Sequence, residues 1–93
     1  MKTVEIITVR LDPRREDPLL RELRTALQKQ KVFEDRVIVE LYRHQALKTE
    51  LSIHLRSVSL QADGLPSVLG RRLADALREF GPISHSAWVE EGT

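Results

Sequence analysis

The chain has 93 residues, of which 41% are apolar and 31% are charged, and its formal net charge is +1. This length and composition predict one globular domain over residues 1–93, and they exclude a disordered or fibrous chain. The 15 basic and 14 acidic residues leave too little excess positive charge for a nucleic-acid partner, and the absence of cysteine excludes disulfides and thiolate metal sites.

The first predicted strand covers residues 3–11, which are rich in β-branched side chains. Residues 12–17 end it, because Pro13 cannot continue a hydrogen-bonded ladder. A helix is expected to begin at Asp17, whose carboxylate can accept from free backbone amides, with Pro18 at the first helical position. Its apolar stripe contains Leu20, Leu23 and Leu27. We expect it to end near residue 30 or 31.

Two further strands are predicted at residues 37–43 and 51–57, where apolar and polar side chains alternate. One face carries Val37, Val39 and Leu41 from the first segment and Leu51, Ile53 and Leu55 from the second. These faces are assigned to the core. The intervening residues are few enough for an antiparallel hairpin.

The second helix is expected to begin within residues 63–67, the segment Asp-Gly-Leu-Pro-Ser. Its predicted apolar stripe is Leu69, Leu73, Ala76, Leu77 and Phe80. Gly81 followed by proline should end it. Gly70 inside the helix has two interpretations: close approach of a ligand or partner, or close packing of the helix on the sheet.

The last strand is predicted at residues 83–90, and its two faces compete for burial. One face contains Ile83, His85, Ala87 and Val89, and the other contains Ser84, Ser86 and Trp88. If the first face is buried, the His85 imidazole lies in the interior and needs a hydrogen-bond partner. If the second face is buried, the Trp88 indole gains burial, but two serine hydroxyls are also removed from water. Burial of the His85 face is favoured.

The order of elements is therefore β-α-β-β-α-β, which predicts an α+β ferredoxin-like fold. Right-handed crossovers place the four antiparallel strands in the order 4-1-3-2, with both helices on one face of the sheet. The other face is left open. It is expected to carry Ile6, Thr8, Arg10, Ile38, Glu40, Tyr42, Ser52, His54, Arg56 and Trp88. This mixture of large apolar and polar side chains indicates a surface that a ligand or second subunit covers.

The element order, the size and the terminal segment Ile83-Ser84-His85-Ser86-Ala87-Trp88-Val89 resemble the dimeric α+β barrel superfamily, which includes antibiotic-biosynthesis monooxygenases. The resemblance covers residues 3–90. It implies a homodimer whose sheets face each other, with small-molecule pockets in some members. No catalytic motif of those enzymes matches residue by residue, so the resemblance assigns no catalytic residue.

Five open-face residues are the candidate ligand-binding set: Glu40, Tyr42, His54, Arg56 and Trp88. His54 and Arg56 project from one face of their strand and could hold an anion or polarise a carbonyl, with Glu40 orienting either of them. The alternative is a cross-strand charge pair at a dimer interface. Tyr42 and Trp88 could frame an apolar pocket. The histidine spacing matches no metal motif, and we expect neither a metal nor a cofactor.

Three functions remain open. The preferred one is a homodimeric interaction or small-ligand-binding module that uses the open sheet face. The second is a cofactor-independent monooxygenase acting on a small hydrophobic aromatic substrate, as the resemblance implies. The third is an accessory domain that binds a protein by strand addition at a sheet edge. We expect a cytoplasmic protein that binds neither nucleic acid nor membrane, because no segment approaches the roughly 20 apolar residues of a membrane span and the first residues lack a secretory apolar region.

Overall fold

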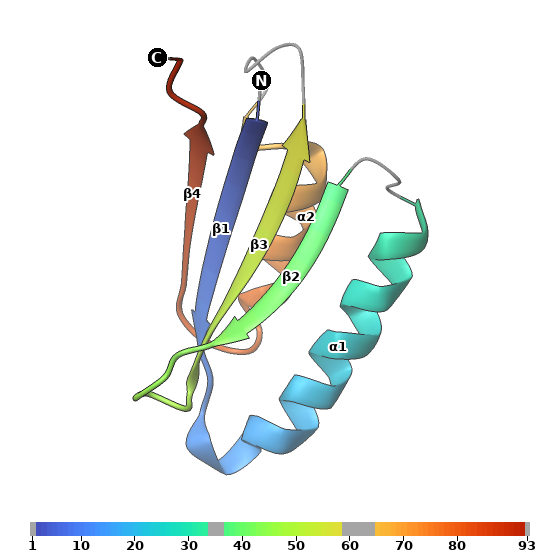
Figure 1. Cartoon of the computed structure of the whole chain (residues 1–93). Coiled ribbons are helices and arrows are strands. Elements are labelled where there is room, and N and C mark those ends of the chain that lie inside the picture. The colour runs from blue at the N-terminus through green and yellow to red at the C-terminus, as the bar shows by residue number, and fades with distance from the viewer. Residues whose placement is uncertain (1, 34–36, 59–64, 93) are drawn as a thin grey trace.

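The computed structural model describes residues 2–33, 37–58 and 65–92. Its elements are β1 (Lys2–Arg10), the 3-10 turn η1 (Pro13–Arg15), α1 (Glu16–Phe33), β2 (Val37–Arg43), β3 (Glu50–Val58), α2 (Val68–Leu77) and β4 (Ile83–Val89). The strands form one antiparallel sheet in the order β2-β3-β1-β4 (Figure 1). The predicted α+β ferredoxin-like fold with strand order 4-1-3-2 is confirmed.

The first helix begins earlier than the sequence predicted. Asp12 Oδ1 accepts a hydrogen bond from the Arg14 amide at 2.9 Å, and the turn η1 runs directly into α1. Asp17 therefore lies within the helix and not at the position before its first residue. The helix continues to Phe33 because no glycine or proline follows Pro18 within it. Within the described residues, no helix has the length and apolar character needed to cross a bilayer.

The second helix begins after Ser67, whose Oγ accepts a hydrogen bond from the Gly70 amide at 3.0 Å. Its buried residues are Leu69, Gly70, Leu73, Ala74 and Leu77. The prediction of Ala76 in the apolar stripe is wrong, because the positions facing the sheet follow an i, i+4 ridge that includes Ala74 and leaves Ala76 exposed. Asp63 and Gly64, part of the predicted helix start, lie outside the described residues.

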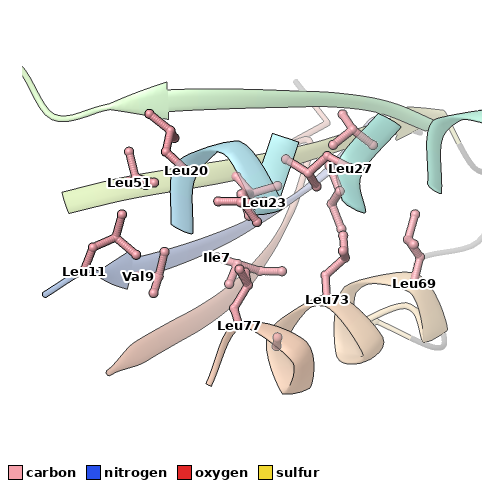
Figure 2. Close-up of a cluster of buried hydrophobic side chains, with 14 residues drawn as sticks. Ile7, Val9, Leu11, Leu20, Leu23, Leu27, Leu51, Leu69, Leu73 and Leu77 are labelled. Atoms are coloured by element: carbon pink, nitrogen blue, oxygen red, sulfur yellow. The ribbon is translucent and has the colours of Figure 1, made fainter. Parts of the chain in front are cut away.

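The core lies between the helices and one face of the sheet (Figure 2). On β1 it takes Ile7 and Val9, and on β3 it takes Ile53, all at 0–1% exposure. The alternation predicted for β2 and β3 is confirmed, since Val39, Leu51 and Leu55 are buried with them. Leucines of both helices complete the cluster: Leu20, Leu23, Leu27, Leu69, Leu73 and Leu77. The side chains of the two central strands therefore alternate between a buried face under the helices and the opposite, open face of the sheet.

A glycine allows β4 to leave α2 and pair with β1. Gly81 has a φ of +155°, and a Cβ there would lie 1.9 Å from the Arg10 carbonyl oxygen. Directly beside it, the Arg10 amide donates to the Pro82 carbonyl at 3.1 Å. Gly81 is thus required by close approach to the end of β1. The helix itself ends earlier, at Leu77.

Candidate functional site

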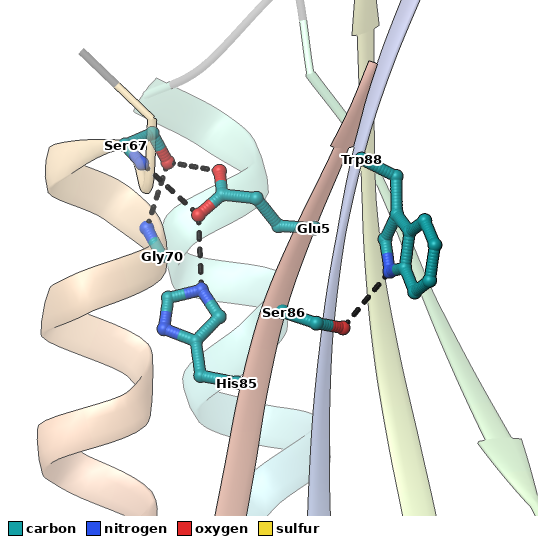
Figure 3. A network of polar contacts seen from close by, with 6 residues as sticks. All are labelled: Glu5, Ser67, Gly70, His85, Ser86 and Trp88. Carbon is teal, nitrogen blue, oxygen red and sulfur yellow. Dashed lines mark hydrogen bonds and ion pairs between the residues drawn. The ribbon is translucent and has the colours of Figure 1, made fainter. Parts of the chain in front are cut away.

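The strand register arranges the open-face side chains in three rows that cross the whole sheet. The first row is Ile38, Arg56, Val4 and Trp88; the second is Glu40, His54, Ile6 and Ser86; the third is Tyr42, Ser52, Thr8 and Ser84. We call these three rows the open face. Neither helix covers it, and in Figure 3 Trp88 and Ser86 lie on the side of the strands away from both helices. All five candidate residues, Glu40, Tyr42, His54, Arg56 and Trp88, are on this face.

Glu40 orients Arg56 and not His54. The Arg56 Nε lies 2.7 Å from Glu40 Oε1, although His54 is the residue directly opposite Glu40 in the register. The long guanidinium side chain reaches diagonally to the neighbouring strand. Both side chains are partly exposed, at 53% for Arg56 and 31% for Glu40. The pair fixes the direction of the guanidinium on the open face and contributes little to stability.

His54 belongs to a separate group in the middle of the open face. Its ring lies against Tyr42, with centroids 4.6 Å apart and planes tilted by 45°. Its Nε2 lies 3.2 Å from Ser52 Oγ. The trio of Glu40, His54 and Arg56 expected from the sequence is therefore divided into an ion pair and an aromatic contact. Either group presents polar atoms to a molecule that packs on the open face.

The open face is hollowed at the end where β1 begins. The hollow has a volume of about 470 Å³, and its lining includes Val4, Ile38, Arg56 and Trp88, which are the whole first row. The Trp88 Nε1 donates to Ser86 Oγ at 2.9 Å, so the polar atom of the indole is satisfied on the sheet. The ring is left to offer apolar surface.

A second hollow, of about 260 Å³, lies at the opposite end of the open face. Its lining includes Tyr42, Ile6 and Thr8. Tyr42 and Trp88 thus line different hollows of the single chain. Val4 and Lys2 also line the larger hollow, and neither is in the candidate set predicted from the sequence. Their places follow from the alternation in β1, which continues to its first residue.

On the helix side, an interior polar network joins β1, β4 and the start of α2 (Figure 3). The Glu5 carboxylate accepts hydrogen bonds from the Ser67 amide at 3.0 Å and from the Ser67 hydroxyl. The His85 Nε2 lies 3.0 Å from Glu5 Oε1. The side chains of His85 and Glu5 are 15% and 6% exposed. The favoured orientation of His85 is confirmed, and Glu5 is its partner.

The network lies on the helix side of the sheet, opposite the open face. Gly70 packs directly on Glu5, and a Cβ at Gly70 would lie 2.1 Å from Glu5 Oε1. The close-packing interpretation of Gly70 is therefore correct, with a carboxylate as the neighbour. At the outer end of β4, Ala87 and Val89 share the His85 face but are exposed. Within residues 2–33, 37–58 and 65–92, no three histidine or acidic side chains are grouped so that they could hold a metal ion.

Solved structures with this fold include several monooxygenase-like proteins. Rv0793 from Mycobacterium tuberculosis is 20% identical, with a TM-score of 0.67 over 100% of this chain and 98% of its own. A putative antibiotic biosynthesis monooxygenase from Deinococcus radiodurans is 14% identical, with a TM-score of 0.70 over 98% of this chain and 94% of its own. A monooxygenase from the gene ActVA-Orf6 of Streptomyces coelicolor, in complex with Nanaomycin D, is 16% identical, with a TM-score of 0.64 over 98% and 88%.

No protein-family model and no curated protein matches the chain. The likeness to the antibiotic-biosynthesis monooxygenase group, expected from the order of elements, is confirmed at the level of the fold. At 20% identity or less it defines the architecture alone.

Proposed function

We propose that the protein is a homodimer in which two open faces pack against each other and enclose a pocket for a small molecule. The observation that carries this proposal is the exposure of large apolar side chains on a sheet face that no helix covers. Ile38 is 54% exposed, Tyr42 is 47% exposed and Trp88 is 58% exposed. Apolar groups gathered on one face of a small domain mark an interaction surface.

Two arginines of this region support burial against a second copy, because each is already paired with a glutamate of the same chain. Arg56 is held by Glu40, and Arg10 Nη2 lies 2.7 Å from Glu50 Oε1. A packed sheet face therefore need not bury an isolated charge, which is the costly case. Aromatic residues and arginine are also the residue types enriched at protein interfaces. A second copy offers a self-complementary partner, since a two-fold interface uses the same patch on both chains.

The hollow beside Trp88 supports a ligand role for the same face. Its volume of about 470 Å³ falls within the range of small-molecule sites, roughly 300–1,000 Å³. Packing of a second sheet over the first row would enclose it. Ile38 and Trp88 then supply apolar walls, and Arg56 supplies a guanidinium for a carbonyl or an acid group.

The self-association is tested with Ile38→Glu. A carboxylate in the first row of the packed face should weaken dimerisation by at least about 30-fold, because it buries an unpaired charge in the interface. Light scattering and sedimentation velocity over a concentration series measure it. Val68→Glu is the matched control, because Val68 is 63% exposed on α2, on the helix side of the sheet. A wild-type chain that stays monomeric at high concentration, or equal weakening by both variants, contradicts the proposal.

A cofactor-independent monooxygenase is the second candidate, and the names of the structural neighbours favour it. In such a reaction one oxygen atom of O₂ enters a small phenolic aromatic substrate, and the other leaves as water with two hydrogens of the substrate. The apolar hollow would hold the aromatic ring, and Arg56 would polarise its oxygen. Mass spectrometry of the aromatic after incubation with the protein and O₂ tests it. No oxygenated product above the buffer control rules out the activity for that substrate class.

A further inference from the structure

The strand β4 forms one edge of the sheet, and no described element lies along its outer side (Figure 1). At one end of the strand the Glu90 amide donates to the Lys2 carbonyl at 2.8 Å. At the other end the Pro82 carbonyl accepts from the Arg10 amide at 3.1 Å. In an antiparallel ladder this pattern means that the even-numbered residues of β4 bond to β1. The backbone N–H and C=O groups of the odd-numbered residues therefore point away from the sheet: Ile83, His85, Ala87 and Val89.

This edge of β4 has none of the features that usually protect an exposed strand. In the described part of the chain, its outward backbone groups have no hydrogen-bond partner. Edge strands are commonly protected by proline, by charged side chains or by a bulge. The strand Ile83–Val89 contains no proline, lysine, arginine or acidic residue, and its register with β1 is continuous. The other edge strand, β2, carries Glu40 and Arg43. The edge of β4 is therefore free to pair with a further strand.

Side chains at the outer end of β4 are uncovered on both faces of the sheet. Ala87 and Val89 lie on the helix-side face, yet both are exposed, and 41% of Val89 is accessible. Trp88 is exposed on the opposite face. A strand laid along this edge would contact side chains on both faces, as neighbouring strands of a sheet do.

From these observations we infer that β4 pairs edge to edge with β4 of a second copy of the chain, antiparallel and centred on Ser86. The outward groups of the two strands meet only in a register that places odd-numbered residues opposite odd-numbered residues. When Ser86 lies opposite Ser86 of the second copy, Ile83 lies opposite Val89 and the whole length of both strands is paired. Every outward N–H and C=O group of the strand then has a partner.

The side chains brought together by this register are compatible. On the helix side, Ala87 lies opposite His85 of the second copy, and Val89 lies opposite its Ile83. On the other side, the large Trp88 lies opposite a small residue, Ser84 of the second copy. No acidic or basic side chain of β4 is placed beside one of like charge, because the strand contains none. A two-fold axis supplies this match twice, so the same strand serves as both partners.

Edge pairing uses a different surface from the proposed dimer. It continues the sheet sideways and leaves the open face uncovered, so the two contacts can form together and assemble four chains. Two short strands bury much less surface than two packed sheet faces. We therefore expect edge pairing at higher protein concentrations than the open-face dimer.

The test uses the Ile38→Glu chain, in which the open-face contact is weakened. Sedimentation velocity up to millimolar protein should show one chain becoming two. Hydrogen exchange followed by NMR should show the outward amides of β4 slowed at least about threefold at high concentration. The amides of Ser84, Ser86 and Trp88 already bond to β1, so their exchange should not depend on concentration.

Ala87→Lys, added to Ile38→Glu, should abolish both effects, because a lysine on an edge strand opposes pairing and would lie opposite His85 of the second copy. Ala76→Lys is the matched control: it adds the same charge at an exposed position of α2 and should change neither measurement. The inference is overturned if the outward amides exchange at one rate at all concentrations, if Ala87→Lys associates like its parent, or if the slowed amides belong to β2. These results leave the open-face dimer untouched, since that contact is measured in the wild-type chain at lower concentrations.

Discussion

Ile53→Ala is expected to lower the free energy of unfolding by about 2–5 kcal/mol. Ile53 is 0% exposed at the centre of β3, so truncation leaves a cavity where the strand meets the helices. Its neighbour His54 points to the opposite face, where it contacts Tyr42 and Ser52. His54→Ala should therefore change the unfolding free energy of the single chain by less than about 0.5 kcal/mol, as surface substitutions do.

Urea denaturation measures both variants, and the Ile38→Glu background removes the proposed self-association from the comparison. Equal losses at Ile53 and His54 would mean that the register of β3 is displaced by one residue, because such a shift exchanges the two faces. In the wild-type background, His54→Ala should instead weaken the dimer. The pair of substitutions thus separates the core from the open face.

Glu5→Ala should lower the unfolding free energy by about 3–5 kcal/mol, the range for removing one partner of a buried pair. The carboxylate has three polar partners: the Ser67 amide, the Ser67 hydroxyl and the His85 imidazole. Its removal leaves these groups without their acceptor near the start of α2. Thermal and urea unfolding measure the loss. A change below about 1 kcal/mol, the net contribution of a single hydrogen bond, would contradict the prediction and show that water replaces the carboxylate.

Gly70→Ala tests the same contact more sharply, because the sign of its effect on the free energy of unfolding should depend on whether Glu5 is present. In the wild-type chain the new Cβ lies 2.1 Å from Glu5 Oε1, so the carboxylate must move from its partners, at a cost of about 1–3 kcal/mol. In the Glu5→Ala background the space is free, and alanine should stabilise the helix by up to about 1 kcal/mol.

The control for this double-mutant cycle is Gly92→Ala, where an added Cβ meets nothing within 4 Å. It should be neutral in both backgrounds. Additive effects of Glu5→Ala and Gly70→Ala would contradict the close packing of the carboxylate on the glycine, since contacting residues are expected to couple.

The fold could be predicted from the sequence because two features restrict the possible folds. These are the alternation of apolar and polar residues along the strands and the order of the elements along the chain. In β2 and β3 the period of two assigns Val39, Leu51, Ile53 and Leu55 to one face without knowledge of the partners. Errors arose where several local signals compete. Asp12 and Asp17 both precede a proline, and the sequence alone does not decide which one starts the helical segment.

The contacts of the sites were harder to predict than their faces. Glu40 stands opposite His54, yet the longer Arg56 side chain reaches it diagonally, and side-chain reach is not encoded in alternation. Glu5 and His85 are 80 positions apart and meet only because β1 pairs with β4. A usable signal was present, since Glu5 and His85 are the only ionisable groups on the inward faces of β1 and β4. Two such exceptions on strands predicted to be neighbours indicate a buried pair.

The central claim, that a second copy of the chain covers the open face, is tested most directly by quenching the fluorescence of Trp88 with acrylamide over a series of protein concentrations. Trp88 is the single tryptophan of the chain and is 58% exposed when the chain is alone. Quenching should decrease as the mass rises from one chain of 10.7 kDa to two, and it should stay high in Ile38→Glu at every concentration. Unchanged quenching of the wild type across a transition to two chains would place the interface elsewhere and contradict the account.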